Sequence, residues 1–180
     1  MLATLTLLAD IGIVASILYM ISRRLGRSLE PVEGRLIPFL TERYREVSLL
    51  IASTATAGSL YMSNVLGWTP CRLCWFQRII IYPLVVLFAV AFLLDRDDVR
   101  DYAAPLAMIG LPIAFYHALM QRVDQFQSAG CSVLSVSCST KYTFFYGYVT
   151  VPVMATTALM AVLLLLWMAS DLEMPSDLFS

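Results

Sequence analysis

The stretch PCRLCWFQRIIIYPLVVLFAVAFLL, residues 70–94, decides the fold, because it places a pair of cysteines at the start of a long apolar run. A helix needs about 20 predominantly apolar residues to cross a bilayer. Segments of this kind recur along the chain, at residues 2–22, 47–66, 75–94, 103–121 and 145–168. Backbone polar groups in lipid must be hydrogen-bonded within the chain, so each of these segments is predicted to be a helix.

The composition also indicates a membrane protein. Of the 180 residues, 59% are hydrophobic and 14% are charged, whereas soluble domains carry about 25% charged residues. The net charge of −1 gives no reason to expect nucleic-acid binding. We expect an all-α polytopic membrane protein with one compact bundle of helices. An additional N-terminal transmembrane helix with a basic cytoplasmic connection would precede the bundle (1–46), and a cytoplasmic tail would follow it (169–180).

Basic residues give the predicted helices an orientation in the membrane. The connections at 23–46 and 95–102 carry Arg23, Arg24, Arg27, Arg35, Arg43, Arg45, Arg96 and Arg100. The opposite side carries Arg72, Arg78, Arg122 and Lys141. Basic connections stay in the cytoplasm, so both cysteine pairs are expected on the extracytoplasmic face of the cell membrane. Persistent disulfides need an oxidising compartment, which favours the same orientation.

Parts of the N-terminal region allow more than one interpretation. Segment 2–22 contains Asp10 and has no basic stretch before it, which argues against a cleaved signal peptide. The connection at 23–46 mixes charged residues with several apolar ones. It is therefore either an amphipathic stretch at the membrane surface or a solvated linker. The polar segment at 95–101 is expected to be a short turn.

The first cysteine pair, Cys71 and Cys74, is separated by two residues, a spacing that serves a redox-active disulfide or half of a zinc site. Pro70 suits the entry to a helix and would put Cys74 in the first turn, where the positive helix end favours a thiolate. Arg78 follows Cys74 by four residues and shares its face of the helix. It could stabilise the thiolate or hold an oxygen atom of a ligand. The alternative is a static disulfide beside an arginine that reaches to the membrane surface.

The second cysteine pair, Cys131 and Cys138, lies in a polar loop between the last two predicted helices. A mobile loop carrying a disulfide could reach both an external protein and the membrane surface. The alternative is a disulfide that only closes a small loop, which contributes a few kcal/mol at most. The cysteines could instead bind zinc. Zinc ribbons repeat the two-residue spacing, however, and this chain has it once, so we expect no metal.

His117 is the single histidine of the chain and lies near the end of segment 103–121, one turn before Gln121. Ionisable side chains in spanning helices are costly and are functional candidates. A histidine there could donate a hydrogen bond to a ligand or handle a proton. The alternative is a packing histidine that is bonded to a neighbouring backbone carbonyl. Gln121 would extend the polar patch or anchor the helix at the interface.

Together these residues resemble a known family. The motif PCRLCWFQR at 70–78, the pair Tyr116-His117 and a cysteine pair in the next outer loop are similar to the bacterial disulfide bond formation protein B family. The short second loop is more like the Gram-positive BdbC-type branch. The resemblance covers residues 47–168 and implies a four-helix transmembrane bundle there. It implies a membrane thiol:quinone oxidoreductase that reoxidises an extracytoplasmic thioredoxin-like thiol oxidase of the DsbA or BdbD type.

The resemblance also implies roles for the cysteines. Cys131 would form the mixed disulfide with the partner protein, and Cys138 would exchange with Cys71. Cys74 would face the quinone, which is either ubiquinone or menaquinone. The protein would act as a monomer among membrane lipids.

The resemblance further implies that Arg78 and His117 lie around the quinone ring. The helix at 2–22 departs from the family pattern. It could pack on the bundle, guard the entrance of the quinone, or hold a partner.

Other functions fit the sequence less well. Vitamin K epoxide reductase homologues run related chemistry on a similar bundle, but their close cysteine pair lies near the start of the last core helix. A scaffold protein with two structural disulfides would show no reduction by a thiol-oxidase partner. A zinc-binding membrane sensor would contain stoichiometric metal and no disulfides.

Overall fold

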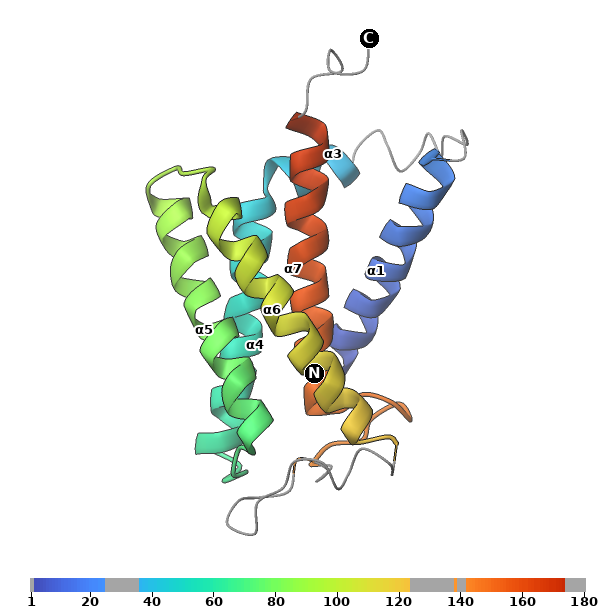
Figure 1. Ribbon diagram of the computed structural model, residues 1–180, viewed down its shortest axis with the longest axis vertical. Coiled ribbons are helices and arrows are strands. Elements are labelled where there is room, and N and C mark those ends of the chain that lie inside the picture. Colours follow the sequence, from blue (N-terminus) through green and yellow to red (C-terminus); the bar gives the residue numbers. More distant parts are fainter. Residues whose placement is uncertain (1, 25–35, 124–137, 139–141, 174–180) are drawn as a thin grey trace.

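The computed structural model describes residues 2–24, 36–123, 138 and 142–173. Within these residues the long elements are helices: α1 (Leu2–Arg24), α4 (Tyr44–Asn64), α5 (Arg72–Leu93), α6 (Val99–Met120) and α7 (Val151–Glu173), with the short α3 (Leu36–Glu42) before α4. Successive long helices alternate in direction (Figure 1). The expected all-α fold is confirmed.

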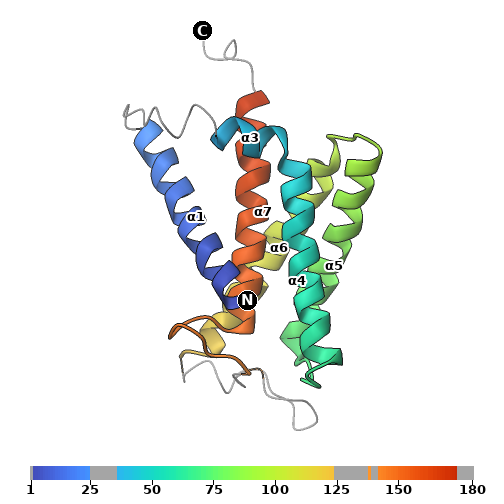
Figure 2. The same cartoon turned by 180° about the vertical axis from the view of Figure 1, so that it is seen from behind.

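Helices α4, α5, α6 and α7 form a bundle, and α1 lies outside it. Helix α6 packs between α5 and α7, while α4 packs against α5 and α7. Helix α1 packs against α7, on the side away from α5 (Figures 1 and 2). The additional N-terminal helix is therefore attached to a four-helix core, as the sequence predicts.

Four of the described helices are long and apolar enough to cross a membrane, over Leu2–Tyr19, Arg72–Leu93, Val99–Met120 and Val151–Ser170. The chain is therefore a multi-pass membrane protein. Helix α4 has a similar length but is less apolar, because it carries Ser48, Ser53, Thr54, Thr56, Ser59 and Ser63. Such hydroxyls can bond to the preceding turn of their own helix, as Thr54 Oγ1 does to the carbonyl oxygen of Leu50 at 2.7 Å.

The core is formed by large apolar side chains packed against small residues of α6. Phe88 of α5 and Leu159 of α7 are almost fully buried, in one cluster with alanines of α6. A Cβ atom at Gly110 would lie 2.7 Å from Cγ2 of Ile80. The glycine therefore lets α5 and α6 approach closely, which is how spanning helices gain contact without a hydrophobic driving force between them.

The predicted start of the last helix, residue 145, was wrong, and α7 begins at Val151. Phe145 and Val149 instead pair as an isolated antiparallel bridge. Between them, Tyr146 and Gly147 have φ values of 52° and 74°. A right-handed helix cannot continue through residues in the left-handed region, so this turn delays the start of α7. Helix α7 also extends to 173, beyond the predicted end at 168.

The connection at 23–46 is partly helical. Helix α3 packs against α7 and α4. Its Leu40 packs against the bundle core, while Phe39 remains 53% exposed. For the residues that the structure describes, this favours the amphipathic interpretation over a solvated linker. Residues 25–35 lie outside the described part of the chain.

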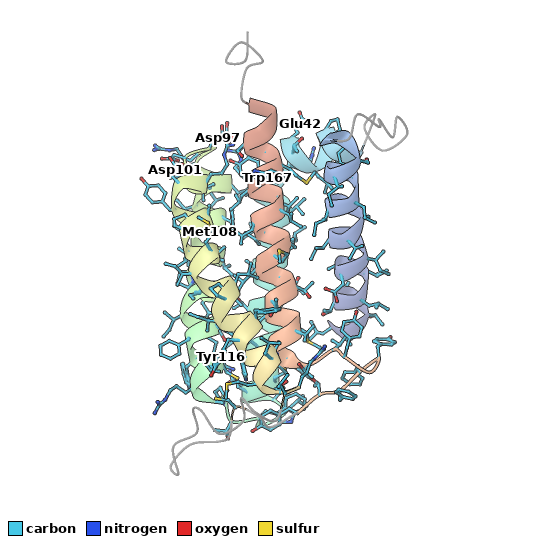
Figure 3. All side chains as sticks on the ribbon, turned by 45° about the vertical axis from the view of Figure 1, so that its right-hand side comes forward. Glu42, Asp97, Asp101, Met108, Tyr116 and Trp167 are labelled. Atoms are coloured by element: carbon cyan, nitrogen blue, oxygen red, sulfur yellow. The ribbon has the colours of Figure 1, made fainter. Side chains whose placement is uncertain are left out.

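The two ends of the bundle differ in their side chains. At the end that carries α3, Arg45 forms an ion pair with Asp95 at 2.7 Å. Figure 3 shows Asp97 and Asp101 at this same end, and Tyr116 toward the other end. The N-terminus of α5, with the first cysteine pair, lies at the end away from α3 (Figure 1).

Candidate functional site

The first cysteine pair lies at the N-terminus of α5. Cys71 is the residue before the helix, with an extended backbone (φ −74°, ψ 175°), and its Sγ accepts a hydrogen bond from the backbone N–H of Cys74 at 3.4 Å. The two sulfur atoms are 3.0 Å apart. Cys71 is buried, whereas Cys74 is half-buried. Small side-chain rotations would join these sulfurs as a disulfide, so the pair can open and close without a change of fold.

The environment of Cys71 predicts how its thiol reacts. The hydrogen bond with Cys74, followed by burial, raises the pKa of Cys71 to about 12, against about 8.5 for an exposed cysteine. A raised pKa keeps the thiol protonated, so little thiolate is present at neutral pH.

In the reduced protein, the rate of alkylation of Cys71 by iodoacetamide should therefore rise about tenfold per pH unit from pH 7 to 10, as measured by mass spectrometry of the labelled peptide. A rate that levels off near pH 9, as expected of the denatured protein, would contradict this.

His117 joins the two cysteine regions. It is 1% exposed, and its Nε2 lies 3.1 Å from the carbonyl oxygen of Cys138 and 3.6 Å from Sγ of Cys71. A carbonyl oxygen can only accept, so Nε2 carries the hydrogen, and Nδ1 accepts from the side-chain amide of Gln77 at 3.1 Å. The ring N–H is therefore placed between the Cys138 backbone and the Cys71 sulfur, where it can also donate to a thiolate.

Cys138 of the second predicted pair lies close to Cys71. The sulfur atoms of both residues and a ring nitrogen of His117 all lie within 4.8 Å of one another. Cys138 is buried in a small cluster with Cys71 and Met120. Side-chain rotation can bring sulfurs at this separation to bonding distance. Cys131, the other member of the pair, lies outside the described residues.

Contacts of Tyr142 join the segment before Cys71 to the segment after Cys138. The rings of Trp68 and Tyr142 are stacked, with centroids 5.2 Å apart and an interplanar angle of 12°. The Tyr142 hydroxyl donates to the carbonyl oxygen of Thr69 at 3.2 Å. Since Trp68 and Thr69 shortly precede Cys71, and Tyr142 follows Cys138 by four residues, these contacts fix how the second connection approaches the first.

Arg78 lies one turn after Cys74, but its guanidinium is held by α4. Its Nε and Nη2 donate to the hydroxyl and the carbonyl oxygen of Ser59, at 3.0 and 3.1 Å. Its Cζ also lies 5.4 Å from the ring centre of Trp75, and the Tyr82 hydroxyl donates to the same Ser59 hydroxyl at 3.3 Å. The position of the arginine is thus fixed by a neighbouring helix.

A cavity of about 350 Å³ adjoins the cysteines. Cys71, Cys74, Arg78 and His117 line it, together with mostly apolar residues of α1, α4, α5 and α7. Ligand pockets are typically apolar with a few placed polar groups. The arrangement can therefore hold an apolar ligand with a few polar atoms in contact with a cysteine pair.

Sequence reasoning assigned no role to Gln77 or Ser59. Gln77 is 4% exposed and orients the His117 ring. The sequence feature that could have identified Gln77 is its polar amide side chain, which lies three residues after Cys74 in a mostly apolar helix. Ser59 holds Arg78, but among the many hydroxyl residues of α4 it carries no distinguishing signal.

Comparison with known proteins agrees with this geometry. The sequence model of the family described as "Disulfide bond formation protein DsbB" matches residues 43–170, more than half of the chain. Disulfide bond formation protein C of Bacillus subtilis is 37% identical over 117 residues, which cover 65% of this chain and 85% of that protein. Probable disulfide formation proteins of Oceanobacillus iheyensis and Chlamydia caviae are 40% and 37% identical, covering 70% and 73% of this chain and 90% and 94% of those proteins.

No solved structure matches the chain. The family match contains the whole core bundle, α4 to the greater part of α7, and both cysteine pairs. The relatives are named for disulfide formation, a thiol–disulfide oxidation, and at least four helices of this chain are suited to a membrane. The expected family is confirmed: this chain belongs to the DsbB family of disulfide bond formation proteins and is a membrane disulfide oxidoreductase.

Proposed function

We propose that this protein takes electrons from an extracytoplasmic thioredoxin-like thiol oxidase and passes them to a membrane quinone. One observation carries the proposal. Cys138, Cys71 and Cys74 bring their sulfurs together at one end of the bundle, beside an apolar cavity. A relay from an external protein to a lipid-soluble acceptor needs such a sequence of sites, because each exchange requires direct contact between sulfur atoms.

The electrons would move by balanced thiol–disulfide exchange. The partner dithiol would become a disulfide as the Cys131–Cys138 bond is reduced, through a mixed disulfide at Cys131. The Cys138 thiolate would attack Sγ of Cys71, forming a Cys71–Cys138 bond and releasing the Cys74 thiolate. Cys131 would then attack Cys138, restoring the loop disulfide and releasing Cys71. The net result is one oxidised partner and one Cys71/Cys74 dithiol, with two electrons transferred.

Two side chains would support this exchange. The Nε2 atom of His117 lies 3.6 Å from Sγ of Cys71. Its N–H would donate a hydrogen bond to the thiolate released at Cys71. Gln77 holds the ring in the tautomer that this donation requires. His117 would therefore act on the cysteines, in addition to lining the cavity.

The residues around the cavity fit a quinone. The lining is mostly apolar, and Arg78, Gln77 and His117 bring N–H groups to it. This combination suits a ring with carbonyl oxygens and an apolar tail, as in ubiquinone and menaquinone. When bound, a quinone would accept the two electrons and two protons of the Cys71/Cys74 dithiol and leave as the quinol. Arg78 would position the ring against Cys74.

The proposal places the cysteine end of the bundle outside the cytoplasm. The basic residues of the end with α3, among them Arg45 and Arg96, support this orientation. A thioredoxin-like partner that forms disulfides also works in an oxidising compartment.

The test is an anaerobic assay with purified protein in detergent, a short-chain quinone and a reduced thioredoxin-like dithiol protein, followed by quinone absorbance. Loss of quinone that depends on both cysteine pairs supports the relay. No loss, with all four cysteines blocked to alkylation, would indicate structural disulfides.

Replacing Arg78 by Ala should raise the KM for quinone about tenfold while leaving the KM for the partner unchanged. A hydrogen bond to a charged group contributes about 1.5–3 kcal/mol, and Ser59 holds this guanidinium at the cavity wall. Both constants are read from the same assay by varying one substrate at a time. Arg72→Ala is the matched control, since Arg72 is exposed and is not among the cavity-lining residues. An unchanged KM for quinone would remove Arg78 from the site.

Zinc binding is a second candidate function, because Cys71, His117 and Cys138 place two sulfurs and a ring nitrogen within 4.8 Å. Zn²⁺ binds such ligands. Metal analysis and thiol titration of the isolated protein distinguish the two functions. One zinc per chain with no disulfide would favour a zinc site, and disulfides that a dithiol partner reduces would favour the relay.

A further inference from the structure

Helix α1 precedes the residues that match the family, which begin at 43, yet it lines the cavity beside the cysteines. We propose that α1 forms the wall against which the apolar tail of the quinone lies, and that the Asp10 carboxylate holds this wall in place. The inference rests on the proposed function, because it concerns the ligand of the same cavity.

The cavity-lining residues of α1 share one face of the helix. They are Leu2, Leu5, Thr6 and Ala9. Their spacing, i, i+3, i+4 and i+7, places them on one side of a helix. Leu8 belongs to a different face: it is 64% exposed and does not line the cavity. Helix α1 therefore supplies one side of the cavity with these four residues.

Neighbouring helices leave a space beside this face. A Cβ atom at Gly58 of α4 would lie 3.0 Å from Cδ1 of Leu2, so the glycine leaves room for the leucine. Helix α7, against which α1 packs, lines the same cavity with the small residues Ala155, Ala158 and Ala161. Small residues of α4 and α7 are thus part of the cavity lining beside α1, together with larger apolar residues of both helices.

Asp10 fixes α1 to the bundle. Its carboxylate accepts hydrogen bonds from Thr157 Oγ1 of α7 at 2.6 Å and from the Tyr148 hydroxyl at 2.9 Å. The carbonyl oxygen of Tyr148 accepts in turn from Arg122 Nη2 at 2.6 Å. An acidic side chain in a spanning helix is costly unless it is paired. Only 6% of the span Leu2–Tyr19 is buried, against 33% of each of the other spans. Apolar packing therefore holds α1 only weakly, and these hydrogen bonds strengthen its attachment to the bundle.

The division of polar groups around the cavity indicates which part of the ligand α1 contacts. Arg78 and His117 come from α5 and α6. The contribution of α1 is apolar apart from Thr6, whose hydroxyl donates to the Leu2 carbonyl oxygen of its own helix at 3.0 Å. The carbonyl oxygens of a quinone ring would find donors on α5 and α6. The α1 face suits the hydrocarbon tail.

The experiment measures quinone binding by quenching of tryptophan fluorescence, since Trp68 lines the cavity. Leu5→Ala removes part of the wall, and Ala9→Phe fills the space in front of it. Both should weaken binding of a decyl-tailed quinone about tenfold and change binding of a tail-less quinone by less than about twofold. The matched controls, Leu8→Ala and Ala15→Phe, alter exposed positions of the same helix and should bind both quinones as the parent does.

The Asp10 attachment has its own pair of variants. Asp10→Leu removes both hydrogen bonds and should weaken the tailed quinone about as much as Leu5→Ala does. Asp10→Asn keeps an acceptor oxygen for Thr157 or Tyr148 and should weaken it less. Parent-like binding by Asp10→Leu would overturn the role given to Asp10.

Two results would overturn the wall itself. One is parent-like binding of the tailed quinone by both Leu5→Ala and Ala9→Phe, and the other is an equal loss for tailed and tail-less quinones. Binding needs no turnover, so a parent protein that binds quinone without reducing it would overturn the proposed function alone, and the variants would still decide this inference. A parent that binds neither quinone would overturn both.

Discussion

A Cys74→Ser variant is expected to lose at least about 10³-fold of its quinone reduction and to accumulate a disulfide between Cys71 and Cys138. Serine at position 74 leaves no Cys71/Cys74 dithiol to pass two electrons to the quinone. In this variant, the cysteine sulfur that remains near Cys71 among the described residues is that of Cys138, within 4.8 Å. The anaerobic assay measures the loss, and peptide mapping under non-reducing conditions identifies the trapped disulfide.

The control is a variant that carries both Cys74→Ser and Cys138→Ser. It should be equally inactive but should lack the Cys71–Cys138 peptide, which shows that the peptide reports the exchange partner. Quinone reduction by Cys74→Ser at the parent rate would rule out the proposed route. Pairing of Cys71 with Cys131 in place of Cys138 would reverse the order of the loop cysteines.

A Cys138→Ser variant should separate the two halves of the relay. Turnover of the protein partner should fall by at least about 10³-fold, because the loop loses the sulfur that reaches Cys71. Quinone reduction driven by dithiothreitol should stay within about threefold of the parent, because a small dithiol can attack the half-buried Cys74 directly. Both rates are measured in the same preparation by changing only the reductant.

The parent protein with each reductant supplies the reference for this comparison. If Cys138→Ser still turned over the protein partner, the partner or Cys131 would have to react with the first pair directly. If it lost both activities, Cys138 would be needed for the structure of the site, and a melting curve would show the loss of stability.

Helices α1, α5, α6 and α7 were predictable because a membrane imposes a simple length and hydropathy requirement, which α4 meets in length but not in hydropathy. The starts of α4, α5 and α6 fall within four residues of their predicted positions. The start of α7 was not predictable in this way. Phe145 and Val149 are apolar and extend the apolar run, and the positive φ values between them follow from the local turn.

The positions of some site residues relative to one another were predictable, and their contacts with other helices were less so. The two-residue spacing of Cys71 and Cys74 brought their sulfurs together without reference to any other helix. Helical spacing also placed Arg78 on the face of Cys74. Helical spacing could not reveal that Ser59 holds the guanidinium of Arg78, because Ser59 belongs to another helix. The spacing of residues along one helix does not identify the residues of a neighbouring helix.

The contacts of His117 bear on both interpretations that the sequence left open. It is a packing histidine in that it donates to a backbone carbonyl, as the simpler interpretation requires. That carbonyl belongs to Cys138, however, and the same nitrogen lies beside the sulfur of Cys71. A single sequence cannot predict this, because the contact joins residues that are 46 positions apart.

The bond between His117 and the Cys138 carbonyl has a kinetic consequence. Cys138 is held within 4.8 Å of Cys71, so the proposed exchange between them would be intramolecular and would need no encounter with a free thiol. The internal exchange should therefore proceed at a rate that dilution of the protein does not change. Under the proposed relay, encounter with the partner would then be the concentration-dependent step on the thiol side, and the abundance of that partner would set the rate at which disulfides are supplied.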